Sequence, residues 1–148
     1  MKKYIGFKLI QAEPMSLGDY NTFRGWKIPS DEDPMKEGYK ILYPDGYVSW
    51  SPNEVFETSY MQIGDNNSIT QQNVDSFIKE VSVNTLGEKT TVVRATLVNG
   101  FEIVESSSCV DPANYCEKMG AEICLNRIKN KIWELLGFLL QTANKGIN

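Results

Sequence analysis

Histidine is absent from the 148-residue sequence. The chain therefore cannot build a Ser-His-Asp or Cys-His nucleophile system, a histidine general base or a histidine-ligated zinc site. Hydrolysis by carboxylates alone is formally open, but nothing in the sequence favours it. We expect a protein that is not an enzyme and needs neither a metal nor a cofactor.

Cysteine is scarce. The chain has three, Cys109, Cys116 and Cys124, and no Cys-x-x-Cys spacing. An odd number of cysteines without that spacing is typical of reduced thiols in a cytosol. Cys116 and Cys124 are two helical turns apart, so we expect them to be small core residues on one helix face.

The sequence also has no run of about 20 apolar residues, the length that a transmembrane helix needs. Its net charge is −4, and binding to a nucleic-acid backbone requires clustered Lys and Arg. We therefore expect neither a membrane nor a nucleic acid as partner. A hydrophobic content of 41% against 23% charged residues is enough for an ordinary globular core.

Composition divides the chain near residue 64. Residues 1–64 contain 11 of the 16 aromatic residues and five of the six prolines. Residues 65–148 contain the long apolar-periodic stretches, and the polar segment 64–68 has the composition of a linker. We predict an aromatic-rich module over residues 1–64 and a second module over residues 65–148.

The first module is predicted to be a small α+β unit. Residues 4–12 alternate as a strand does, and a short helix should begin at Ser16 and end before Gly25. Residues 39–43 and 47–50 read as a hairpin around Pro44-Asp45-Gly46. Ser51, Pro52 and Glu54 then have the spacing of a capping box, which predicts a helix to about residue 60.

The second module is predicted to be an antiparallel sheet that one helix precedes and another helix follows in the sequence. Thr70 can cap a helix to about residue 80, and residues 81–86 can form a strand. Residues 90–98 and 101–107 flank Asn99-Gly100, a strong signal for a type I′ turn, which needs positive φ at both central residues.

A long C-terminal helix is expected after Asp111-Pro112, which should cap it, and Gly137 could end it. Its predicted core stripe follows three- and four-residue steps: Ile123, Ile128, Ile132, Leu135 and Leu136. Its exposed apolar side would suit a subunit interface, and we assign to that side Ile132, Trp133, Leu136 and Leu139. The predicted fold is α+β, an antiparallel sheet packed on this helix.

Several motifs of the second module occur in a recognisable order. They are Ser68-Ile69-Thr70, Asn99-Gly100-Phe101, Cys109-Val110-Asp111-Pro112-Ala113-Asn114, Gly120 and the apolar run of residues 132–140. In order and spacing they resemble a family of small tailed-phage proteins related to the type-one Thoeris anti-defence proteins. The resemblance covers about residues 66–143. Residues 1–62 resemble a second small phage module.

The resemblance implies a function. Proteins of that anti-defence group act as sponges in the host cytoplasm: they bind cyclic ADP-ribose isomers, and some bind cyclic oligonucleotides of CBASS-type systems, without cleaving them. It also implies a homo-oligomer, built from dimers and up to a hexamer, with ligand pockets between subunits. These are expectations from the resemblance and not from composition or spacing.

Such a sponge needs a flat apolar face for a base and cations for phosphates. Phe101 is the candidate stacking residue, although a residue after a hairpin turn can instead face the sheet core. Arg127 is the candidate phosphate ligand, and Lys131 is one turn further on the same helix. The alternative for Arg127 is a solvated position or a pair with Glu134.

Two further positions of the second module are candidates. Arg94 shares a strand face with Val92 and Thr96, where it could line a ligand pocket or pair with Glu102 or Glu105 on the neighbouring strand. Asn114, beside Asp111, could offer phosphate-binding amides at a helix start, although capping is the simpler role.

The first module offers an aromatic cleft or a protein-binding surface, or simply a small aromatic core. Its candidate ligand residues are Arg24, Trp26, Tyr47 and Trp50. Together with the acidic loop Asp31-Glu32-Asp33 they motivate an alternative function, a phage protein-interaction module that binds and inhibits a host protein. A carboxylate-based hydrolase is a third and weaker hypothesis.

Overall fold

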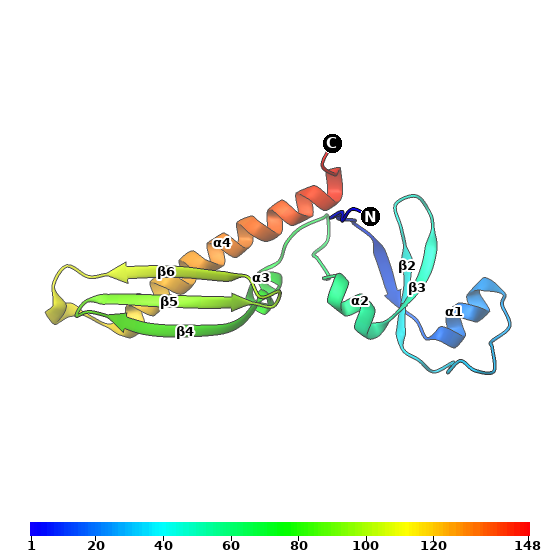
Figure 1. Cartoon of the computed structure of the whole chain (residues 1–148), viewed down its shortest axis with the longest axis horizontal. Coiled ribbons are helices and arrows are strands. Elements are labelled where there is room, and N and C mark those ends of the chain that lie inside the picture. The colour runs from blue at the N-terminus through cyan, green and yellow to red at the C-terminus, as the bar shows by residue number, and fades with distance from the viewer. The chain divides into compact units, whose positions relative to one another are not determined.

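The computed structural model describes all 148 residues and divides them into two compact units. The first unit comprises Met1–Gln62 with Gln141–Asn148, and the second comprises Ile63–Leu140. Each unit contains one three-stranded antiparallel sheet and helices (Figure 1). The α+β fold class predicted from the sequence is confirmed.

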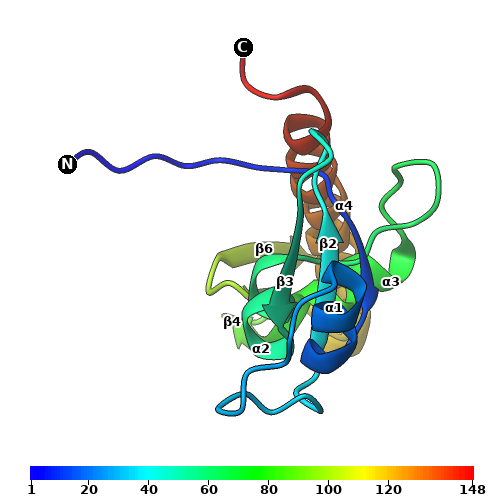
Figure 2. The ribbon, with the colours of Figure 1, turned by 90° about the vertical axis from the view of Figure 1, so that its right-hand side faces the viewer.

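The sheet of the first unit has the order β1-β2-β3, with β1 at Gln11–Pro14, β2 at Gly38–Leu42 and β3 at Val48–Pro52. β2 and β3 form the predicted hairpin and lie side by side in Figure 2. Helix α1, Leu17–Arg24, is capped by the Ser16 side chain and ends at Gly25, which has a φ of 71°. The prediction for α1 and for the hairpin is therefore confirmed.

Two predictions for the first unit are wrong. The strand expected over residues 4–12 is confined to β1, because β2 already turns away after Leu42, the partner of Gln11. The expected capping box at Ser51 does not form, because Ser51 is still paired with Tyr39 in the sheet. Helix α2, Asn53–Ser59, starts after Pro52 and has no side-chain cap.

Few side chains of the first unit are fully buried; Tyr20 and Ile41 are its buried apolar ones. Aromatic contacts connect its elements instead. The rings of Tyr39 on β2 and Phe56 on α2 stack with centroids 4.0 Å apart, and Phe56 contacts Tyr60 at 5.0 Å. The unit is thus held by half-buried rings, as a chain segment poor in aliphatic residues requires.

The second unit begins with α3, Gln71–Phe77, and continues with β4, Ile78–Leu86, β5, Thr90–Leu97, and β6, Glu102–Ser108. A capping box joins Thr70 and Asn73 at the start of α3. The helix predicted to about residue 80 ends three residues earlier, because residue 78 onward pairs with β5. A single 3-10 turn, η1 at Pro112–Asn114, leads to α4, Glu117–Lys145.

The β5–β6 turn differs from the predicted type I′ turn. Gly100 has a φ of 86°, but Asn99 is not among the residues with positive φ. Gly100 N–H donates to the Leu97 carbonyl at 2.9 Å, and Leu97 N–H donates to the Phe101 carbonyl at 2.8 Å. This pattern is that of a type I turn followed by a left-handed glycine, the common three-residue hairpin loop.

Helix α4 packs on one face of the second sheet (Figure 1), and its contact row follows a four-residue step. The buried members of that row are Cys124, Ile128, Ile132 and Leu136. They meet the alternating inward residues of β5, Val93, Ala95 and Leu97, together with Val74 and Ile103. These residues form the continuous aliphatic core of the second unit.

Several predictions for α4 need correction. Ile123 and Leu135 lie beside the core row and are exposed, whereas Ile132 and Leu136, assigned to an exposed interface, are buried. Asp111 caps only η1, because Tyr115 returns to an extended conformation before α4 begins. Gly137 lies within α4, and Cys116 is exposed while Cys124 is buried.

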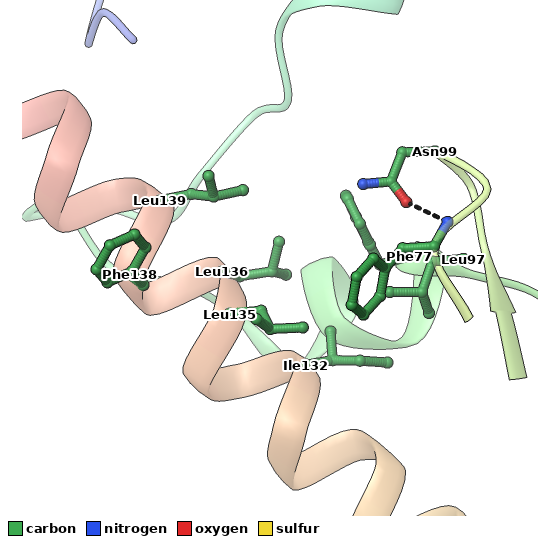
Figure 3. Close-up of a pocket in the computed structure, with 9 residues that line it drawn as sticks. Phe77, Leu97, Asn99, Ile132, Leu135, Leu136, Phe138 and Leu139 are labelled. Carbon is green, nitrogen blue, oxygen red and sulfur yellow. Dashed lines mark hydrogen bonds between the residues drawn. The ribbon is translucent and has the colours of Figure 1, made fainter. Parts of the chain in front are cut away.

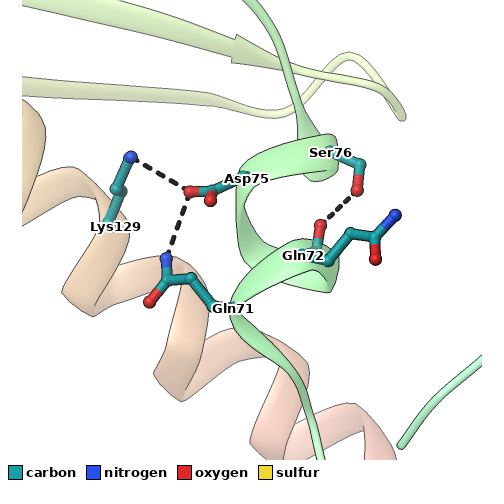
Figure 4. A network of polar contacts seen from close by, with 5 residues as sticks. All are labelled: Gln71, Gln72, Asp75, Ser76 and Lys129. Carbon is teal, nitrogen blue, oxygen red and sulfur yellow. Dashed lines mark hydrogen bonds and ion pairs between the residues drawn. The ribbon is translucent and has the colours of Figure 1, made fainter.

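A polar network joins α3 to α4 in the second unit (Figure 4). Asp75 Oδ1 lies 3.0 Å from Lys129 Nζ and accepts a hydrogen bond from Gln71 Nε2 at 3.1 Å. These two contacts, first that of Lys129, lower the pKa of the Asp75 carboxyl below its ordinary value. The network links the exposed side of α3 to α4.

No helix in the structure combines the length and the apolar character needed to cross a lipid bilayer. Nor does any group of three or more Cys, Asp and Glu side chains converge closely enough to hold a metal ion.

Candidate functional site

An apolar pocket of about 190 Å³ opens beside the β5–β6 turn, between the turn, α3 and α4 (Figure 3). Its only polar lining residue is Asn99. The apolar lining residues are Phe77, Leu97, Phe101, Ile132, Leu135, Leu136, Phe138 and Leu139. All of them belong to the second unit, so one folded sheet and its helices create the pocket.

Phe101 contributes an exposed ring to this pocket. The ring is 56% exposed, so the alternative that it faces the sheet core does not hold. The turn fixes the backbone of Phe101, because Asn99 Oδ1 accepts a hydrogen bond from its N–H at 3.0 Å. The aromatic ring of Phe101 therefore offers a large apolar face next to the turn.

Arg127 and Lys131 lie on α4 where the helix passes β6. Arg127 Nη1 donates to the Ser106 carbonyl at 2.8 Å, and Lys131 Nζ lies 2.6 Å from Glu105 Oε1. The structure therefore pairs Arg127 with a strand carbonyl, not with Glu134. The Lys131 side chain is 51% exposed, so its ammonium group remains accessible to an anion in solvent.

The two cations and the pocket follow one side of α4 in order. Lys131 is one helical turn after Arg127, and the pocket residue Leu135 is one turn after Lys131, about 6 Å per step along the axis. Phe138 lies about one turn further. The site thus combines an apolar, aromatic end with a cationic end along a single helix.

Arg94 lies elsewhere. It is exposed on the face of β5 opposite the buried residues Val93 and Ala95. Its direct cross-strand neighbours are Ser82 and Val104, so neither of the predicted glutamate partners lies opposite it. The structure does not bring Arg94 together with the pocket.

Asn114 is exposed in η1, where Asp111 Oδ1 accepts the Ala113 N–H at 2.9 Å. The capping role proposed for Asp111 is thus present, although it serves a single 3-10 turn. Such a turn has no aligned row of free amides, so the predicted helix-start site at Asn114 has no long helix behind it.

The first-unit candidates do not form one cleft. Arg24 places its guanidinium 4.8 Å from the exposed Trp26 ring, which makes one cationic and aromatic patch on the unit's surface. Trp50 is partly buried, and its Nε1–H donates to the Met15 carbonyl at 2.7 Å. Tyr47 is exposed in the β2–β3 turn and contacts Tyr43, with ring centroids 5.6 Å apart.

Sequence reasoning missed Phe77, Leu135, Phe138 and Leu139 as pocket residues. The sequence does contain a signal for these residues: near its end, α4 carries more apolar residues than one core row with four-residue steps can bury. Leu135 was instead assigned to the core row and Leu139 to an exposed interface, and the helix end expected at Gly137 left Phe138 outside the helix.

Comparison with known proteins gives one match. Residues 69–144 match the sequence model of a family described as phage protein (N4 Gp49/phage Sf6 gene 66). The matched segment contains α3, β4, β5, β6, η1 and all but the last residue of α4, and with them every residue that lines the pocket. No curated protein and no solved structure matches the chain.

Proposed function

The chain belongs to the phage protein (N4 Gp49/phage Sf6 gene 66) family, and we propose that it binds and sequesters a cyclic nucleotide immune signal of the host without cleaving it. In this proposal it acts as an anti-defence sponge in the host cytoplasm. The ligand is a cyclic ADP-ribose isomer or a cyclic oligonucleotide, and the protein works as a homo-oligomer.

The observation that carries the proposal is the exposed Phe101 in an apolar pocket, together with two cations, Lys131 and Arg127, that lie one and two helical turns before the pocket residue Leu135 on α4. A nucleobase stacked on an aromatic ring gains about 1–3 kcal/mol. The neighbouring rings and aliphatic side chains, such as Phe138 and Leu135, supply the apolar walls that small-molecule sites need.

Lys131 and Arg127 support the anionic part of the ligand. An arginine can hold a phosphate with two parallel hydrogen bonds, and a lysine acts as a point charge. Each is engaged in one contact in the absence of ligand. On binding, a phosphate oxygen of the ligand would replace the Glu105 carboxylate as the partner of the Lys131 ammonium group. One anionic partner of Lys131 is then replaced by another.

The test is calorimetric titration of the purified protein with a panel of cyclic ADP-ribose isomers and cyclic oligonucleotides. We expect Phe101→Ala to weaken binding by about 1–3 kcal/mol, or roughly 5- to 150-fold in Kd, because the stacking face is lost. Mass spectrometry after denaturation should return the ligand intact.

Phe23→Ala is the matched control. Phe23 is exposed to 54%, close to the 56% of Phe101, but lies in the first unit, so its loss should leave ligand binding unchanged. No heat with any member of the panel, or recovery of a cleaved ligand, would contradict the proposal.

The patch of Arg24 and Trp26 favours a second candidate, binding and inhibition of a host protein through the first unit. Arginine and tryptophan are the residue types most enriched in interface hot spots. Affinity capture from host lysate with wild type and with Trp26→Ala should then differ by a specific protein. If both variants retain the same background, this candidate fails.

A further inference from the structure

The four sheet edges of the molecule are unequally protected against adding another strand. β1 is four residues long and ends in Pro14, and β3 is five long and ends in Pro52. On β6, the Ser106 carbonyl is occupied by Arg127. Short strands, prolines and covering side chains are the usual means of blocking an edge.

β4 is neither short nor interrupted by proline; Tyr115 and Glu117 contact the Thr85 hydroxyl near its end, and its register irregularity lies at its start, between Ile78 and Glu80. The strand is nine residues long, contains no proline and carries no charge over residues 81–86. Val81 and Val83 point to the α4 side of the sheet, since they pair with the buried Ala95 and Val93. They nevertheless remain 42% and 39% exposed, so the apolar row of the sheet is open at this edge.

The sequence of β4 is complementary to itself when reversed. In an antiparallel pairing that places Ser82 opposite Ser82 of a second copy, Val81 faces Val83 and Glu80 faces Asn84. Both valine pairs would lie on the α4 side, where cross-strand apolar pairs stabilise a sheet. No like charges face each other, and the twofold axis closes the assembly at two copies.

We propose that the β4 edges of two copies pair antiparallel about a twofold axis at Ser82 and join their sheets into one six-stranded sheet. The partner is a second copy of this chain. The pairing does not depend on the proposed ligand, because no residue of β4 lines the pocket beside Phe101.

The experiment measures molar mass by light scattering after size exclusion. Wild type should elute at twice the chain mass of 16.8 kDa. Ser82→Lys and Ser82→Glu each place like charges opposite one another at the axis and should raise the dimer Kd at least about tenfold. Mixing the two variants should restore a dimer, because the opposed charges then attract.

Ser106→Lys is the matched control, since it puts the same charge on the same sheet face at the β6 edge and should leave the dimer intact. Hydrogen exchange of wild type supplies a readout that needs no variant: the amides of residues 80–84 should gain protection as protein concentration rises. Circular dichroism checks that each variant is folded.

Three outcomes would overturn the proposal. They are a wild type that stays monomeric at every concentration, an assembly that both Ser82 variants leave unchanged, and an assembly that is lost on deleting residues 2–8 or on Phe138→Ser but not at Ser82. The last result would place the interface on the N-terminal segment or at the pocket.

Discussion

The two units build their cores from different kinds of side chain. The second unit buries nine residues in one cluster, built mainly from aliphatic side chains of β5 and α4. The first unit buries two large apolar side chains, Tyr20 and Ile41, and relies on ring contacts and on hydrogen bonds such as that of Trp50. Aliphatic packing excludes water from whole side chains, whereas half-buried rings do so only in part.

This difference predicts unequal stability. The free energy from burial scales with the apolar area removed from water. The second unit should therefore unfold at a higher denaturant concentration than the first. Trp133 lies in the second unit, and Trp26 and Trp50 lie in the first. Fluorine-labelled tryptophan therefore gives separate signals for the unfolding of each unit.

The largest effect is expected from Ile128→Ala. The Ile128 side chain is fully buried against β5, so its truncation leaves a cavity and should cost about 2–5 kcal/mol of unfolding free energy. Urea titration followed by the Trp133 signal measures the loss.

Ile123→Ala is the control for this change. The same atoms are removed from a side chain that is 39% exposed, and the expected loss is under about 1 kcal/mol. Equal losses at the two positions would show that the four-residue contact row is not the core of the unit.

Gly38→Ala should produce an intermediate effect in the first unit. A Cβ at residue 38 would lie 2.3 Å from the Trp50 ring and 2.4 Å from the Ser51 carbonyl oxygen. The backbone of β3 cannot yield without losing its pairing with β2, so we expect a cost of about 1–3 kcal/mol from overpacking. The Trp50 signal should shift to lower urea while the Trp133 signal stays.

Gly6→Ala is the matched change, because a Cβ there meets no atom within 4 Å. The urea midpoint of the Trp50 signal in Gly6→Ala should equal that of wild type. A Gly38→Ala protein whose Trp50 midpoint is unchanged would mean that the close packing of β2 on the tryptophan adds nothing to stability.

The sequence predicted those elements whose signals are local. A helix starts next to Ser16 and Thr70 caps α3, as expected, and the turn residues of both hairpins lie where the chain reverses. The errors arose where a distant partner decides. Ser51 could not cap α2 because Tyr39 holds it in the sheet, and residues 4–10 had no partner strand although their pattern alternates.

The candidate site was predicted in the same uneven way. Arg127 and Lys131 share one side of α4, because the helical repeat places them one turn apart, and Phe101 lines the pocket further along that helix. Arg94 was grouped with them, but the parity of β5 puts it on the opposite face of the sheet. Which face α4 covers depends on tertiary packing, and no local signal in the sequence reveals it.

The smallest effect, and the one that separates electrostatics from packing in the second unit, concerns Asp75. Because Lys129 and Gln71 lower its pKa, the folded state holds the carboxylate more strongly than the unfolded state does. The resulting stability is fully present above the unfolded pKa and is lost as pH falls through the lower folded pKa. Thermal unfolding of wild type and Asp75→Asn should therefore differ at neutral pH and converge in acid.

A double-mutant cycle identifies the source of this difference. Lys129→Gln should remove most of the same pH-dependent increment, and adding Asp75→Asn to it should cost little more, since both changes break one interaction. Strictly additive losses would mean that the two residues stabilise the protein separately. The link between α3 and α4 would then rest on the apolar contacts of Val74 and not on the charge pair.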